Sequence, residues 1–168
     1  MSEYKVFGDN AGETGNDIRE LLSSGGVPYK IMKSVRDYKA SMDTHLQAIC
    51  GYLQTSGIEY DYGLEANYAA FQAKGGSDES EFGKALLHSH LDYLEYNLGQ
   101  FTSADPSFAE AFMASFTGKK ILVRPAADAS SFQGGCRSRF TAGGELLIEY
   151  KVFGDNAGET GNDIRELF

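Results

Sequence analysis

A segment of nineteen residues occurs twice in this chain without a single difference. Residues 3–21 read EYKVFGDNAGETGNDIREL, and residues 149–167 repeat this sequence at the opposite end. Natural duplications drift apart at exposed positions, so complete identity indicates a recent copy, most simply an engineered one. The repeat constrains the fold, because a domain with one position for this segment now has two candidates to fill it.

The length of 168 residues fits one domain with an appended segment. We expect residues 1–26 to be the N-terminal copy followed by a Ser/Gly linker, and residues 27–168 to form a single α+β domain. The linker reading rests on the Ser-Ser-Gly-Gly run at residues 23–26, which also suits a natural helix end followed by a turn.

Composition limits the classes of partner. The formal net charge is −9, and each copy of the repeat contributes a net charge of −3. An acidic chain lacks the basic field that nonspecific nucleic-acid binding needs. No apolar run has the length of a membrane span or a signal peptide, so we expect a cytoplasmic protein without a membrane partner. The two cysteines, Cys50 and Cys136, are too few for a disulfide framework.

Four segments carry hydrophobic residues every three or four positions, a spacing that predicts helices. Their expected ranges are residues 28–56, 61–74, 78–97 and 106–117. Pro28 suits a first helical turn, and Gly57 ends the longest segment.

After residue 118 the pattern changes to that of strands, expected at residues 121–124, 132–141 and 145–153. They predict a three-stranded antiparallel meander, followed by a short terminal helix. A three-residue loop between the last two strands places Cys136 opposite Tyr150. The same register makes Arg137 and Glu149 cross-strand neighbours on the exposed face.

The C-terminal copy is the better candidate for the native position. Only this copy continues directly from the apolar residues 146–148, which fix the register of the strand. We therefore expect Val152 to lie in the core, and its counterpart Val6 to matter much less for stability.

Candidate catalytic residues are few. Cys136 follows two glycines and precedes Arg137, a setting that could activate a thiol with His88 or His90 as the base. The alternative is a small strand residue that faces the core. Residues two apart on a helix point about 200° apart, so His88 and His90 cannot chelate one metal ion. His45 lies on another helix and could meet one of them, but no familiar ligand spacing supports a metal, and we predict no cofactor.

Two function classes remain open. The first is a noncatalytic protein-interaction domain that uses the duplication for strand exchange, edge filling or a conformational switch. Its partner would be another protein or a second copy of the chain, bound through a sheet edge in an oligomer. Its predicted interaction residues are Tyr4, Val6, Phe7, Tyr150, Val152 and Phe153.

The second class is a small cysteine-dependent hydrolase or transferase that uses Cys136 and a histidine. The chain contains no Walker motif, no GxGxxG and no GxSxG, which favours the noncatalytic reading.

Overall fold

The computed structural model describes residues 26–76, 78–155 and 157–168. The N-terminal copy, with its predicted interaction residues Tyr4, Val6 and Phe7, lies outside these described residues. No helix among the described residues is both long enough and apolar enough to cross a membrane.

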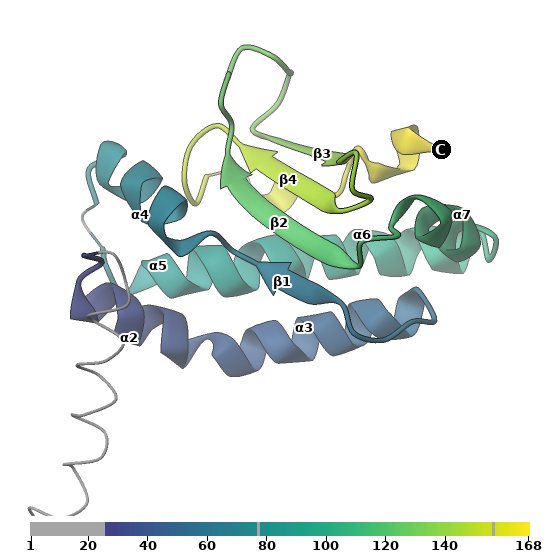
Figure 1. Ribbon diagram of the computed structural model, residues 1–168, viewed down its shortest axis with the longest axis horizontal. Coiled ribbons are helices and arrows are strands. Elements are labelled where there is room, and N and C mark those ends of the chain that lie inside the picture. The colour runs from purple at the N-terminus through teal and green to yellow at the C-terminus, as the bar shows by residue number, and fades with distance from the viewer. Residues whose placement is uncertain (1–25, 77, 156) are drawn as a thin grey trace, which may run out of the picture.

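One sheet lies on one layer of helices, with α3 and α6 running beneath it (Figure 1). The strands are β1 (Glu59–Asp61), β2 (Lys120–Pro125), β3 (Cys136–Phe140) and β4 (Leu146–Tyr150). Their order in the sheet is β1-β2-β4-β3. β1 is parallel to β2 and β2 is parallel to β4, whereas β3 is antiparallel to β4.

The α-helices of the described residues are α2 (Tyr29–Asp37), α3 (Lys39–Tyr52), α4 (Leu64–Ala73), α5 (Glu81–Lys84), α6 (His90–Ala104) and α7 (Phe108–Ser115). A π-helical turn, Ala85–Ser89, joins α5 to α6. Two 3₁₀ turns, Ala157–Glu159 and Ile164–Leu167, close the chain.

The predicted α+β class is confirmed in its mixture of helices and strands, but the three-stranded antiparallel meander is wrong. The hairpin of β3 and β4 has the predicted register, with Cys136 opposite Tyr150 and Arg137 opposite Glu149. However, β2 pairs in parallel with the other side of β4, and β1 adds a fourth strand. Alternating hydrophobicity identifies the two faces of a strand and leaves its neighbours and direction open.

The predicted count of four helices is also wrong in detail. The first predicted helix is interrupted at Tyr38, whose ψ of 2° lies outside the helical range, so α2 and α3 are separate. The third contains the π-helical turn and continues to Ala104. β1 was missed because its three residues, Glu-Tyr-Asp, contain no apolar run.

Part of the C-terminal copy lies in the core. Phe153 stacks on Phe82 with ring centroids 5.0 Å apart, and Tyr150 and Ile164 are fully buried. Val152 is 41% exposed, so the expectation that it lies in the core is wrong. The reason is that β4 ends at Tyr150, so its alternation does not reach residue 152.

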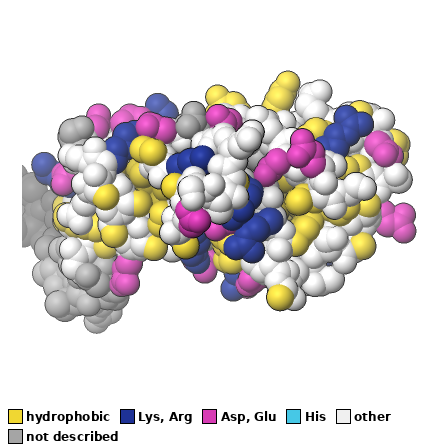
Figure 2. All heavy atoms as spheres, turned by 90° about the horizontal axis from the view of Figure 1, so that it is seen from above, with side chains coloured by type: hydrophobic (Ala, Val, Ile, Leu, Met, Phe, Trp, Pro, Cys, Tyr) yellow, Lys and Arg dark blue, Asp and Glu magenta, His cyan; other side chains and the backbone are white. Residues whose placement is uncertain are grey.

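The outer face of the sheet carries ion pairs. Glu149 accepts hydrogen bonds from Arg137 at 2.6 Å and from Arg139 at 2.8 Å, and Asp61 pairs with Arg124 at 2.8 Å. Glu149 is only 7% exposed, so the predicted pair lies deeper than the exposed position expected for it. Burial alone raises the pKa of Glu149, but the two arginines outweigh it and lower that pKa. Viewed from this side, basic and acidic side chains lie next to each other (Figure 2).

Close packing of α5 on α2 depends on Gly83, since a Cβ there would lie 2.0 Å from the Ser34 carbonyl oxygen. We predict that Gly83→Ala destabilises the chain by about 1–3 kcal/mol through overpacking. The matched control is Gly51→Ala on α3, an exposed site with nothing within 4 Å of an added Cβ. In the control, the higher helix propensity of alanine should raise the free energy of unfolding by up to about 1 kcal/mol. Urea denaturation compares the two, and equal stabilities would contradict the packing of α5 on α2.

Candidate functional site

The candidate functional site is the surface that holds the C-terminal copy, and we call it the segment site. Its members are Lys74 at the end of α4, His90 and Asn97 on α6, and the backbone of residues 135–138 in and before β3. Together they hold Phe153, Asp155 and residues 159–163 by hydrogen bonds to side chains and to main-chain oxygens.

Two carboxylates of the C-terminal copy cover the edge strand β3. Glu159 Oε2 accepts hydrogen bonds from the backbone N–H groups of Gly135 at 2.5 Å and Cys136 at 3.3 Å. Asp163 Oδ2 accepts one from the N–H of Ser138 at 2.7 Å. These contacts occupy N–H groups that a further strand would need. The sequence predicted self-association through a sheet edge without naming the strand, and this arrangement at β3 lends that prediction no support.

Thr160 is the buried anchor of the segment site, with no solvent exposure. Its hydroxyl lies 2.8 Å from His90 Nδ1, and its carbonyl oxygen accepts a hydrogen bond from the Asn97 amide at 2.9 Å. The same amide donates to Asn162 Oδ1 at 3.1 Å. Because unpaired buried polar groups are costly, these contacts stabilise the C-terminal copy in this position.

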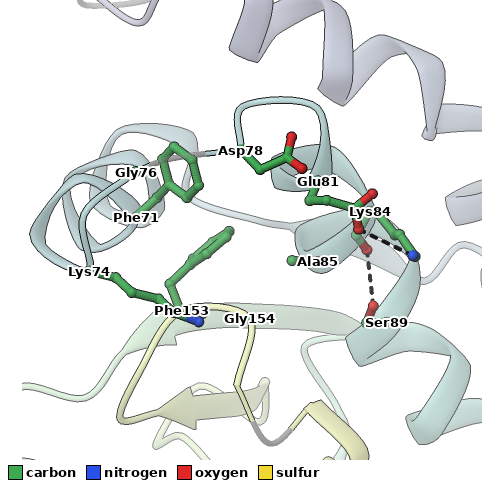
Figure 3. Close-up of a pocket in the computed structure, with 10 residues that line it drawn as sticks. All are labelled: Phe71, Lys74, Gly76, Asp78, Glu81, Lys84, Ala85, Ser89, Phe153 and Gly154. Carbon is green, nitrogen blue, oxygen red and sulfur yellow. Dashed lines mark hydrogen bonds and ion pairs between the residues drawn. The ribbon is translucent and has the colours of Figure 1, made fainter.

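Lys74 holds the start of the loop that follows β4. Its ammonium donates to the Phe153 carbonyl oxygen at 3.0 Å and also pairs with Asp155. Beside this contact lies a pocket of about 330 Å³, in which Phe71 and Phe153 lie next to each other (Figure 3). The C-terminal copy therefore forms one wall of the pocket, through Phe153 and Gly154.

Cys136 and His90 lie on either side of Thr160. The Thr160 hydroxyl is 3.9 Å from the Cys136 sulfur, so the structure places it between the thiol and the imidazole. Burial raises the pKa of the Cys136 thiol to about 11, and burial lowers the pKa of His90 to about 4. At neutral pH both groups are uncharged, which differs from the thiolate–imidazolium pair of a cysteine nucleophile. A catalytic role for Cys136 stays a prediction.

His88 is not brought to Cys136 and instead contacts Ser41 and His45 on α3. The predicted divergence of His88 and His90 therefore agrees with their different partners. Among the predicted interaction residues, Tyr150 and Phe153 are buried, whereas Val152 is exposed.

Sequence reasoning missed these roles of Glu159, Thr160 and Asp163, because the pattern of residues 154–163 indicates only a connecting loop that ends in a helix N-cap. The sequence does show a run of side chains with oxygen atoms in this segment, which could have indicated hydrogen-bonding roles. The backbone groups that they reach lie about 25 residues earlier in the chain, at distances that local turn patterns do not encode.

Comparison with known proteins gives a short overlap. No protein-family profile and no solved structure matches the chain. A protein named "Probable beta-glucosidase M" from Aspergillus oryzae is 30% identical over 101 residues, and one of the same name from Aspergillus flavus is 29% identical over 101 residues. Each match covers 56% of this chain and 13% of the relative. The chain thus spans a small part of these proteins, and the activity in their name is stated of those proteins alone.

The burial of Cys136 leads to a prediction about thiol reactivity. Iodoacetamide at pH 7.5 should modify Cys50, which is half-buried, well before Cys136, because little of the Cys136 thiol is ionised. Mass spectrometry of tryptic peptides over time measures both rates. Denaturant, as the control, should bring the two rates together. Faster labelling of Cys136 than of a model thiol would instead support the cysteine-enzyme reading.

The low pKa of His90 predicts a pH dependence of stability. Between its unfolded pKa, about 6.5, and its folded pKa, about 4, the unfolded chain binds a proton that the folded chain does not. Stability should therefore fall as the pH drops through this window, by about 3 kcal/mol in total. Urea denaturation at several pH values measures the slope. In the control variant His90→Gln, the contribution of His90 to the slope of stability against pH should be absent. An unchanged slope in that variant would contradict the assignment.

Proposed function

We propose that this chain is a noncatalytic interaction domain whose segment site exchanges the C-terminal copy for the identical N-terminal copy, in its own chain or in a second one. The observation that carries this proposal is the set of side-chain contacts that hold the C-terminal copy. Every side chain that the copy contributes to them has a counterpart in the N-terminal copy, because the two sequences are the same.

The contacts are specific enough to discriminate between segments. Glu159 and Asp163 reach backbone N–H groups, and Thr160 satisfies the buried His90. The corresponding residues of the N-terminal copy are Glu13 and Asp17 for the carboxylates. A segment without these groups would leave buried donors unpaired, at about 1–3 kcal/mol for each one.

The two copies differ in their connection to the domain. The C-terminal copy continues directly from β4, and its first two residues, Glu149 and Tyr150, belong to that strand. The N-terminal copy must displace the part of the C-terminal copy that follows β4, from Phe153 onward, and then make the same contacts. Its occupancy is therefore set by the effective concentration that its connection provides.

Exchange offers a route to self-association. When the N-terminal copy of one chain enters the segment site of another, the displaced C-terminal copy becomes available to a further chain. The contacts are conserved at each step, so the cost is mainly the entropy of association. Exchange within one chain gives a two-state switch by the same contacts.

A matched set of threonine variants tests the exchange. Thr160→Val should destabilise a chain that lacks residues 1–26 by about 1–3 kcal/mol, because His90 loses its partner. In the full chain the loss should be smaller, because the N-terminal copy with Thr14 can take the site. The double variant Thr14→Val/Thr160→Val should restore the larger loss. Urea denaturation measures all three, and the same loss in every background would contradict exchange.

Light scattering separates the two forms of exchange. Exchange between chains predicts an assembly at high micromolar concentration that becomes monomeric when residues 1–26 are deleted, with an unchanged helical signal in circular dichroism. A full chain that stays monomeric but shows the threonine rescue would support the switch within one chain. A monomer without the rescue would exclude both.

A further inference from the structure

A cluster of four polar side chains joins the helical layer away from the segment site. His45 on α3 and His88 on the π-helical turn approach each other, with 2.9 Å between His45 Nε2 and His88 Nδ1. Glu95 on α6 lies 2.6 Å from His45 Nδ1. Ser41 Oγ lies 2.9 Å from His88 Nδ1. One carboxylate, two imidazoles and one hydroxyl thus form a continuous chain of contacts.

The cluster is partly accessible to solvent. His45 is 8% exposed, whereas His88, Ser41 and Glu95 are half-buried. His88 faces α3 from the π-helical turn, while His90, two residues later, contacts Thr160 of the C-terminal copy. The cluster is therefore independent of the segment site, and π-helical turns are frequent at functional sites.

The positions of the protons follow from the carboxylate. Glu95 accepts a hydrogen bond from His45 Nδ1–H, so a neutral His45 carries its lone pair on Nε2. That lone pair faces His88 Nδ1, and one proton must lie between the two nitrogens. In the uncharged pair this proton belongs to His88 Nδ1. Two ring nitrogens thus converge on a single point that holds one hydrogen-bonding proton.

We infer that His45 and His88 bind one divalent transition-metal ion of the imidazole-preferring class, represented by Zn²⁺ and Cu²⁺, in place of this shared proton. His45 Nε2 and His88 Nδ1 are the ligands. The His88 Nδ1 proton passes to solvent and solvent protonates His88 Nε2, so both imidazoles remain neutral.

The geometry needs little adjustment. Zinc–nitrogen bonds of about 2.0–2.1 Å in a tetrahedral site place two ligand nitrogens about 3.3 Å apart. The observed separation is 2.9 Å, so the rings must move apart by a few tenths of an ångström and rotate until both lone pairs point at the ion. Glu95 already holds the other nitrogen of His45, which is how a carboxylate orients a metal-bound imidazole.

The ligand set also limits the class of metal. Among the described residues no group of three or more His, Cys, Asp or Glu side chains is arranged to hold a metal ion. The ion would therefore have two imidazole ligands, with water in its other positions and the Ser41 hydroxyl close by. Late first-row ions favour imidazole, whereas Mg²⁺ and Ca²⁺ require oxygen ligands. Such a site leaves coordination positions open to exchange.

Metal titration of the full chain tests the inference. Isothermal titration with ZnCl₂ should show one Zn²⁺ per chain, and MgCl₂ or CaCl₂ at the same concentrations should show none. His45→Gln and His88→Gln should each weaken Zn²⁺ binding at least tenfold, and Glu95→Gln by about 10–100-fold. The matched control is Asp92→Asn, an exposed acidic residue on α6, which should leave the affinity unchanged.

A measurement on the unaltered chain keeps the test valid if a histidine variant fails to fold. In ¹⁵N-histidine NMR spectra, ZnCl₂ should shift His45 Nε2 and His88 Nδ1 and convert His88 to the Nε2–H tautomer, leaving His90 unchanged. Absence of Zn²⁺ binding up to millimolar concentration would overturn the inference. Shifts confined to His90, or Zn²⁺ binding that survives His88→Gln unchanged, would overturn it as well.

Discussion

Thr160 is the residue on which the joining of the helical layer, the sheet and the C-terminal copy depends. Its hydroxyl contacts His90 on α6 and lies near the sulfur of Cys136 on β3, while its carbonyl oxygen accepts from Asn97. All four residues are buried. Polar groups in such a place must pair with one another, because water cannot replace a missing partner. The hydrophobic core brings these elements together, and the C-terminal copy completes this polar junction through Thr160.

Sequence reasoning worked best where a local pattern determines the geometry. The three-residue loop before β4 and the alternation of its side chains gave the hairpin register, including the pairing of Arg137 with Glu149. It failed where neighbours are distant in the chain. The parallel pairing of β2 with β4 leaves no trace in alternation, and the end of β4 at Tyr150 made Val152 an exposed residue.

The candidate sites show the same division. The opposite directions of His88 and His90 follow from helix geometry alone and could be predicted. The sequence allowed His45 to contact either His88 or His90. The packing of α3 against the π-helical turn brings His45 to His88. The carboxylates of Glu159 and Asp163 looked like loop residues, since their backbone partners lie in a different part of the sequence.

The carboxylates of Glu159 and Asp163 that cover β3 link local opening of the C-terminal copy to aggregation of the protein. When Glu159 and Asp163 leave, the N–H groups of Gly135, Cys136 and Ser138 are exposed together. A strand edge in this condition is a template for pairing between molecules. The lifetime of the uncovered edge, rather than the equilibrium between folded and unfolded chains, would then govern the rate of aggregation. Under the proposed exchange, the N-terminal copy would shorten that lifetime, because either copy could then close the edge again.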